Sequence, residues 1–196
     1  GSAQWSAMLY AYADLRRSVR DYWYRADKAA WLFTAFAATI VGGLVLGLQS
    51  VFTYQDARRL RERAFHNESL ACLARNVYFE ARGEPLAGQF AVAEVTMNRK
   101  ASRLFPRTVC EVVYQQNWDP MRKRLVGAFS WTEFKKLPEP TGDEWQRAQH
   151  VAQAVYYNRY TPQLQGALYF HASYIRPDWA KEKRRVTRIG RHVFYK

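Results

Sequence analysis

The residues with the clearest chemical potential lie at 76–85, NVYFEARGEP, around the carboxylate of Glu80. Apolar residues precede Glu80 at three- and four-residue spacing, which is typical of a helix with one buried face. Gly83 and Pro85 are expected to end that helix, because glycine readily takes the left-handed closing conformation and proline cannot continue the hydrogen-bond ladder. The pattern therefore predicts Glu80 in the last turn of a helix.

That position favours a carboxyl group that keeps its proton. The carbonyl groups at a helix end carry partial negative charge, and burial would further disfavour the ionised form of Glu80. A carboxyl group that stays protonated near neutral pH is what general acid catalysis requires. The ordinary alternative is a solvated surface glutamate paired with Arg75 or Arg82, and helix geometry alone favours that alternative.

The surrounding sequence predicts the elements that position this carboxylate. Asn67 or Ser69 is expected to cap the start of the Glu80 helix, and residues 85–88 to form a turn. Residues 115–131, rich in aromatic and small polar groups, are expected to form an irregular loop suited to contacts with sugar rings. Apolar periodicity predicts further helices at 89–100, 108–114 (capped by Thr108) and 143–159, and strands at 167–174 and 185–195, the second interrupted by Gly190.

The chain of 196 residues carries 30 Lys and Arg against 17 Asp and Glu, which indicates an anionic partner. Nucleic acid, membrane headgroups and an acidic polymer such as cell wall all fit that charge. The basic residues are dispersed and form no nucleic-acid motif, so we expect no nucleic-acid partner. The length predicts one globular domain with an appendage.

Cys72 and Cys110 are the two cysteines, and neither belongs to a CxxC pair, so no zinc or redox site is expected. Both lie in apolar surroundings, which favours two buried thiols. A disulfide is the open alternative if the domain is exported. The four histidines lack the paired spacing of a metal-binding helix. We therefore expect no metal and no cofactor.

Residues 29–52 carry no charge and are long enough to cross a hydrocarbon layer of about 30 Å at ~1.5 Å per residue. Trp31 and Tyr54 are expected as interface anchors, after a short basic and aromatic juxtamembrane helix. A buried core helix and a signal peptide are the alternatives. Gly43 and Gly47 have the small-xxx-small spacing that brings two such helices together. Basic residues flank both ends, so charge alone does not set the orientation.

A series of short motifs runs in order from about Glu68 to Lys196: VYFEARGEP (77–85), GQ (88–89), AVA (91–93), NR (98–99), FP (105–106), TVC (108–110), VY (113–114), FSW (129–131), ALYFH (167–171), Pro177 with Trp179, GRH (190–192) and FY (194–195). Taken together, they resemble the spore-cortex-lytic and cell-wall hydrolase family of the SleB/CwlJ type. Each piece alone is a weak signal, and together they are specific. Two positions depart from the family pattern: Gly127-Ala128 replaces the usual Gly-Gln before Phe-Ser-Trp, and Glu94 stands where a small apolar residue is usual.

The resemblance implies an α+β, lysozyme-like fold, with a mostly helical catalytic domain and a small antiparallel sheet, here preceded by one transmembrane helix. It implies cleavage of the peptidoglycan glycan strand between N-acetylmuramic acid and N-acetylglucosamine. Glu80 falls on the position of the family's catalytic glutamate. The residues expected to bind substrate are Tyr78, Glu84, Ser130, Trp131, Tyr169 and His171.

Glycosidases with two carboxylates hold them about 5–5.5 Å apart for retention of configuration and about 6.5–9.5 Å apart for inversion. No second partner for Glu80 is clear: Glu84 lies beyond the predicted helix end and is expected to pair with Arg82 or to orient the loop. Asp119 and Glu133 stay open as partners. A single acid suffices for a lytic transglycosylase, because Glu80 then serves as acid and base in turn. A hydrolytic muramidase or lysis enzyme and a non-catalytic wall-binding or assembly module remain alternatives.

Peptidoglycan lies outside the bacterial inner membrane, and that location sets the expected orientation. The expected partners are peptidoglycan glycan strands, the inner membrane, and a second copy of the chain through Gly43 and Gly47. The predicted parts are a short basic cytoplasmic segment (1–28), a single transmembrane helix (29–53), a charged connector (54–67) and a cell-wall hydrolase domain in the periplasm or cell-wall space (68–196).

Overall fold

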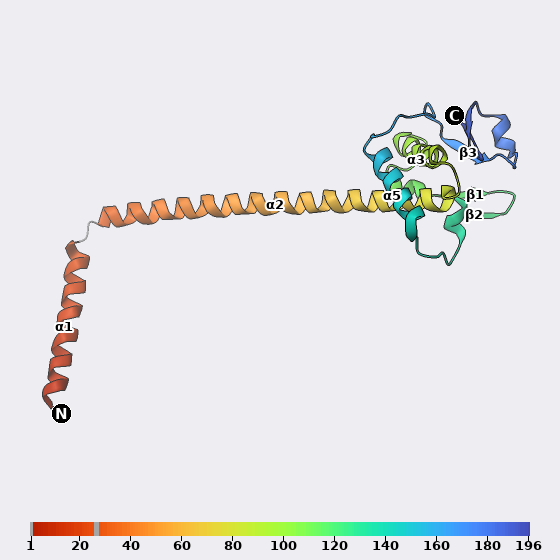
Figure 1. Cartoon of the computed structure of the whole chain (residues 1–196). Coiled ribbons are helices and arrows are strands. Elements are labelled where there is room, and N and C mark those ends of the chain that lie inside the picture. Colours follow the sequence, from red (N-terminus) through yellow and green to blue (C-terminus); the bar gives the residue numbers. More distant parts are fainter. Residues whose placement is uncertain (1, 26–27) are drawn as a thin grey trace. The chain divides into compact units, whose positions relative to one another are not determined.

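The computed structural model describes residues 2–25 and 28–196, and the chain divides into two compact units, Gly1–Arg59 and Leu60–Lys196. Residues 1, 26 and 27 of the expected segment 1–28 lie outside the described residues. Helix α1, Ser2–Arg25, confirms that the basic and aromatic start of the chain is helical. The second unit contains Glu80 and every element after α2 (Figure 1).

Helix α2, Lys28–Ala81, is 54 residues long and carries both the apolar segment and Glu80. The expected cap at Asn67 or Ser69 is wrong, because both residues lie inside this continuous helix. No Gly or Pro occurs from residue 48 to residue 82, and this stretch is rich in the helix formers Arg, Leu, Glu and Ala. By length and composition α2 is able to cross a membrane: an 18-residue window has a mean hydropathy of 2.0, and none of that window is buried.

The end of α2 at Ala81 agrees with the stop signal in the sequence. Gly83, however, is not among the described residues with positive φ, so the expected left-handed closure is wrong. The missing side chain matters for packing instead, since a Cβ at Gly83 would lie 3.1 Å from Nη2 of Arg191. Pro85 is the N-cap of helix α3, Leu86–Ala101, so the chain turns directly from one helix into the next.

Helices α3, α4 (Val109–Val113) and α5 (Gly142–Tyr156) form the rest of the helical part, and α3 contacts both of the others. Their apolar faces and the last turns of α2 share one core, which fixes the helix end that carries Glu80. Fully buried members of this core are Leu73, Val77, Ala93, Val109, Val112, Val113, Val151 and Ala152. A smaller cluster joins α3 to the carboxyl-terminal sheet through Ala91, Val95, Leu164, Ala167 and Phe194.

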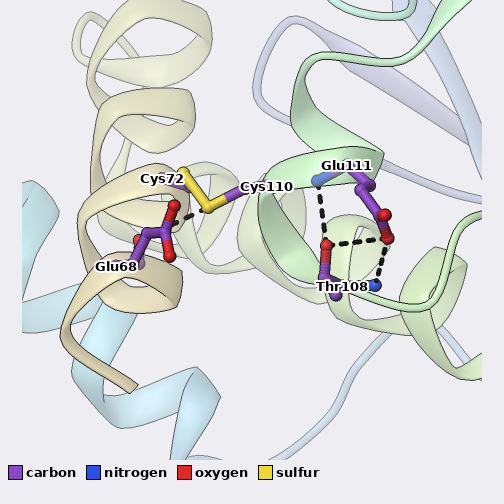
Figure 2. Close-up of a disulfide and its surroundings, with 5 residues drawn as sticks. All are labelled: Glu68, Cys72, Thr108, Cys110 and Glu111. Carbon is purple, nitrogen blue, oxygen red and sulfur yellow. Dashed lines mark hydrogen bonds between the residues drawn. A yellow bond between two sulfur atoms is a disulfide. The ribbon is translucent and has the colours of Figure 1, made fainter. Parts of the chain in front are cut away.

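A disulfide joins Cys72 on α2 to Cys110 on α4, with the two Cα atoms 5.3 Å apart (Figure 2). The expectation of two buried thiols is therefore wrong, because the pairing depends on how two helices pack across 38 residues of sequence. The expected cap of α4 is confirmed: the Thr108 hydroxyl accepts from the Glu111 N–H at 3.2 Å, and the Glu111 carboxylate accepts from the Thr108 N–H at 3.1 Å. This capping box fixes the start of α4 and, with it, the position of Cys110 (Figure 2).

The expectation of an irregular loop at 115–131 is wrong. Strands β1 (Gln116–Asp119) and β2 (Arg124–Gly127) form an antiparallel hairpin, and the 3-10 helix η1 (Ser130–Glu133) follows it. Asp119 closes the hairpin turn, since its Oδ1 accepts from the backbone N–H groups of Met121 and Arg122 at 2.9 and 3.0 Å. Four-residue strands with several polar residues give too weak a pattern to predict.

The second sheet is antiparallel in the order β3–β5–β4. Its strands are β3 (Tyr169–Ala172), β4 (Arg185–Ile189) and β5 (His192–Tyr195), with the 3-10 helix η2 (Asp178–Lys181) between β3 and β4. The predicted strand at 167–174 is confirmed as β3. The interrupted strand at 185–195 is instead a hairpin that turns at Gly190, whose φ is 56°. The second unit is thus mostly helical with small antiparallel sheets.

Candidate active site

Glu80 lies in the last turn of α2, as the sequence predicts, and is partly buried. Burial raises the pKa of its carboxyl group from 4.5 to about 7, while the charge of Arg99 and backbone hydrogen bonds from Trp131 and Ser130 oppose that rise. Both protonation forms are therefore accessible near neutral pH. A carboxyl group with this property is suited to donate a proton and to take one back.

The amino end of η1 faces Glu80 because its side chains are anchored in the core. Trp131 is 6% exposed, and its Nε1–H donates to Oδ1 of Asn76 on α2 at 2.8 Å. The Trp131 ring also stacks on Phe79, with ring centroids 4.8 Å apart. Asn76 is held in turn by its own amide, which donates to Oγ1 of Thr96 on α3 at 3.0 Å. Through these contacts η1 is fixed to the helix that carries Glu80.

Arg99 on α3 is a further candidate residue of the site, which the sequence reasoning missed. Only 7% of the residue is exposed, and its Nε–H donates to the carbonyl oxygen of Leu168 at 2.8 Å. Its guanidinium carbon lies 5.2 Å from the ring centroid of Phe105 and 5.0 Å from that of Phe129. A signal was present in the sequence: Arg99 follows Val95 by four residues, on the buried face of a helix, where an arginine is unusual.

Aromatic side chains of the second sheet and its neighbours adjoin Arg99, on which Tyr169 acts electrostatically. The Tyr169 ring lies 6.0 Å from that of Phe105 and 5.9 Å from that of Trp179, and Nζ of Lys183 lies 3.8 Å from its centroid. His171 stacks on Tyr195 at 5.2 Å, and a 2.9 Å hydrogen bond joins its Nε2 to the Tyr195 hydroxyl. Of these rings, the partly exposed ones of Tyr169 and Trp179 suit contact with the faces of sugar rings.

The other residues predicted to bind substrate lie in different surroundings. Tyr78 is 6% exposed, packs edge-to-face on Trp145 and accepts a hydrogen bond from Arg82 at 3.2 Å, so it belongs to the core. Ser130 is exposed, and its backbone N–H forms a hydrogen bond that lowers the pKa of Glu80. Trp131 and His171 are buried, whereas Tyr169 is partly exposed. Ser130 and Tyr169 are therefore the most accessible of these residues.

Glu84 is 7% exposed and pairs with Arg191 in the β4–β5 turn, so the expected pairing with Arg82 is wrong. Its Oε1 accepts from Nε of Arg191 at 2.6 Å, and its Oε2 accepts from the Arg191 backbone N–H at 2.8 Å. Burial alone would raise the pKa of Glu84, but these hydrogen bonds and the charges of His192 and Arg191 outweigh burial and lower the pKa. Glu84 is thus an ionised residue that ties the loop after α2 to the sheet.

The other carboxylates considered as partners for Glu80 have partners of their own. Glu133 pairs with Arg124 at 2.7 Å, and Asp119 pairs with Arg122 at 3.5 Å while closing the hairpin turn. Glu94 accepts from the backbone N–H groups of residues 163 and 164, both at 3.0 Å, and so holds a loop in place. Within residues 2–25 and 28–196, no three His, Cys, Asp or Glu side chains are grouped so that they could hold a metal ion.

Comparison with known proteins identifies similar chains. The model of the family described as Cell Wall Hydrolase matches residues 83–195, beginning three positions after Glu80. The chain is 32% identical over 130 residues to the spore cortex-lytic enzyme of Bacillus subtilis, covering 66% of this chain and 38% of that protein. The corresponding enzyme of Oceanobacillus iheyensis is 30% identical over 134 residues, which cover 68% and 44%. The chain thus spans less than half the length of these relatives.

Two solved structures are also similar. The catalytic domain of the germination-specific lytic transglycosylase SleB from Bacillus anthracis is 28% identical, with a TM-score of 0.47, covering 65% of this chain and 93% of that one. The catalytic domain of the Bacillus cereus SleB protein is 28% identical, with a TM-score of 0.48, covering 66% and 91%.

Proposed function

We propose, since this chain belongs to the cell wall hydrolase family, that it cleaves the glycan strand of peptidoglycan as a lytic transglycosylase. The bond cut is the one between N-acetylmuramic acid and N-acetylglucosamine. The observation that carries the proposal is the pKa of about 7 for Glu80, at a helix end that faces the backbone N–H groups of η1. A lone carboxyl group of this kind is suited to act as an acid and then as a base.

The proposed reaction uses Glu80 twice. The protonated carboxyl group donates its proton to the glycosidic oxygen as the bond from that oxygen to C1 of the muramic acid breaks. The resulting carboxylate then removes the proton from the C6 hydroxyl of the same sugar, whose oxygen bonds to C1 and closes an anhydro ring. No water is consumed, and Glu80 ends protonated as it began. The partners found for Glu84, Asp119 and Glu133 support a mechanism with a single carboxylate.

Ser130 and Tyr169 are the proposed contacts with the glycan, because they are the more accessible of the candidate residues. Tyr78, Trp131 and His171 are proposed to shape the site from behind, through the core contacts described above. Glu84 is proposed to position the loop that follows Glu80 rather than to touch the sugar.

Location outside the inner membrane is part of the proposal. Residues 29–53 of α2 are proposed to span that membrane, with the short amino-terminal part in the cytoplasm and residues 54–196 in the periplasm or cell-wall space. The disulfide between Cys72 and Cys110 supports this orientation, because such bonds persist in oxidising compartments. Pairing of two spans through Gly43 and Gly47 remains a proposal, which cross-linking at these positions in membranes tests.

Digestion of purified peptidoglycan by the full chain in detergent, followed by mass analysis of the products, tests the proposal. Anhydro-muropeptides are expected. Products with reducing ends would indicate a hydrolytic muramidase instead, and retention on peptidoglycan without any product would indicate a non-catalytic binding module. Cleavage by Glu80→Gln at the rate of the unaltered protein would refute the assignment of the acid.

A further inference from the structure

We propose that the buried Arg99 is a positioning residue that stabilises the ionised form of Glu80 and holds together the two sides of the site. The inference rests on the proposed function, in which Glu80 passes through a carboxylate. Three segments supply the groups involved: Glu80 lies on α2, Arg99 on α3, and the backbone N–H groups that reach Glu80 belong to η1. The geometry around the guanidinium carries the argument.

Three contacts hold the Arg99 side chain, and they come from different parts of the fold. Its guanidinium group lies over the rings of Phe105 and Phe129, and its Nε–H donates to the carbonyl oxygen of Leu168. Phe129 is the N-cap of η1, and Leu168 directly precedes Tyr169 on β3. Arg99 therefore connects the segment whose N–H groups reach Glu80 to the aromatic strand on the other side of the site.

One nitrogen of Arg99 lacks a partner. Its Nη1 is fully buried and has no hydrogen-bond acceptor among the described residues, although a buried donor without an acceptor is costly. An arginine keeps its charge even when buried, so its pKa, lowered to about 10 mainly by desolvation, still leaves it positive at neutral pH. The charge of Arg99 therefore persists inside the site. It acts on Glu80 through space, since no ion pair joins the two residues in the described part of the chain.

Glu80 is the group that becomes an anion. The charged and titratable groups that act on the pair are Arg99 from α3, Glu80 from α2 and Tyr169 from β3, while η1 contributes two backbone N–H groups. A carboxylate at the negative end of α2 and partly out of water is unfavourable by itself. The charge of Arg99 offsets this cost once Glu80 has given up its proton, and the carboxylate is then available to take the C6 proton.

The pH dependence of kcat/KM separates this electrostatic role from a merely structural one. Replacement by Arg99→Met removes the charge, so the pKa of Glu80 rises and the acid form survives to higher pH. We expect the alkaline limb of the profile to move upward by roughly 1 pH unit or more, together with a lower maximum. Arg99→Lys keeps the charge but loses the planar contacts, so activity falls while the limb stays in place. Arg107 is exposed, and Arg107→Met is the matched control: it should leave both the height of the profile and the position of its alkaline limb unchanged.

A second measurement uses the unaltered protein and so avoids any folding defect of the variants. NMR titration between pH 5 and 9, without substrate, follows the Glu80 carboxyl carbon and the Arg99 guanidinium nitrogens, with Glu80→Gln to assign the carboxyl signal. We expect the two sets of signals to shift with the same midpoint, and the Arg99 shift to be absent in Glu80→Gln. Arg99 chemical shifts that stay constant while Glu80 titrates would overturn the inference.

The product analysis and the titration distinguish failure of the proposed function from failure of the inference about Arg99. A protein that yields no peptidoglycan products but shows coupled titration of Glu80 and Arg99 refutes the proposed function and keeps the electrostatic pairing. An active enzyme with uncoupled titration, or an Arg99→Met profile that falls in height without moving its alkaline limb, keeps the function and reduces Arg99 to a packing residue.

Discussion

Glu80 and Glu84 are four positions apart in the chain, yet their carboxyl groups lie in opposite surroundings. Glu80 ends a helix, is partly buried and has its pKa raised to about 7. Glu84 is shielded from solvent, but its carboxylate receives two hydrogen bonds from Arg191 and its pKa is lowered. The comparison teaches that a balance decides whether a carboxyl group is protonated. Both carboxyl groups receive hydrogen bonds, but burial dominates at Glu80, whereas hydrogen bonds and charges together outweigh it at Glu84.

The proposed roles of the two residues therefore differ: Glu80 takes part in the reaction, and Glu84 holds the structure. Arg191 comes from the β4–β5 turn, 107 residues after Glu84, and this long-range pairing fixes the loop that follows α2. Glu80 faces η1 and the charge of Arg99, and its proton remains exchangeable. Changes at the two positions should accordingly affect different measurements.

The largest expected effect is the loss of cleavage in Glu80→Gln. The amide has the shape of the carboxyl group but neither donates nor accepts the proton that is transferred in the reaction. The rate of glycan cleavage should therefore fall by roughly 10²–10⁴-fold. The rate is measured on purified peptidoglycan, with Glu84→Gln as the comparison. A loss of similar size in folded Glu84→Gln would erase the distinction between the two residues.

The same Glu80→Gln variant should be more stable than the unaltered protein at high pH. The pKa of Glu80 is about 7 in the folded protein, against 4.5 for the ordinary group. The contribution of its protonated carboxyl group to the unfolding free energy is therefore fully present below pH 4.5 and is lost as the pH rises through about 7. At about 1.4 kcal/mol per unit, the loss approaches about 3 kcal/mol above pH 8, and the glutamine avoids it. Urea unfolding at pH 4 and pH 8 measures the difference, and equal stability changes at both pH values would contradict it.

Glu84→Gln should show the opposite dependence on pH. The lowered pKa of Glu84 means that its contribution is present above pH 4.5 and is lost as the pH falls below that value. Replacing the carboxylate weakens both hydrogen bonds from Arg191 and should cost about 1–3 kcal/mol of unfolding free energy at pH 7. The control is Glu139→Gln, which breaks an exposed pair with Arg75 and should cost at most about 1 kcal/mol. Indistinguishable losses in the two variants would show that burial of the Glu84 pair has no energetic consequence.

The smallest effect concerns the glycine that faces Glu84. A Cβ added at Gly190 would collide with Oε2 of Glu84, whereas a Cβ at Gly142, which also has positive φ, meets nothing within 4 Å. Alanine with positive φ is unfavourable at both positions. Gly190→Ala should therefore lose about 1 kcal/mol more unfolding free energy than Gly142→Ala, because of the forced contact. Thermal unfolding of both variants measures the excess, and an equal loss would mean that the Glu84 carboxylate moves aside freely.

Local signals in the sequence predict the part of the site that lies on one element. The position of Glu80 in the last turn of α2 follows from its apolar spacing and from the stop at Gly83 and Pro85, and the structure confirms that position. Thr108 likewise caps α4 because the partner residue Glu111 lies three positions away. Both interactions depend on neighbours within a few residues, so the sequence contains all the information they need.

Contacts between distant residues could not be predicted in this way. The pairing of Glu84 with Arg191, the disulfide between Cys72 and Cys110, and the hydrogen bond from Arg99 to Leu168 join positions 38 to 107 residues apart. The hairpin β1–β2 was missed for another reason, because its strands are short and partly polar and its turn is fixed by the side chain of Asp119.

The disulfide also gives the maturation of the chain an order in time. If residues 54–196 cross the membrane in sequence order, as proposed, Cys110 emerges well before β4 and β5. Cys72 and Cys110 are then able to join before the carboxyl-terminal sheet has crossed. The helix that carries Glu80 is then already fastened to α4, but Arg191 and the strand that pairs with Tyr169 have not arrived. The proposed site, assembled in this sequence, stays incomplete until nearly all of the chain after the proposed span has crossed the membrane.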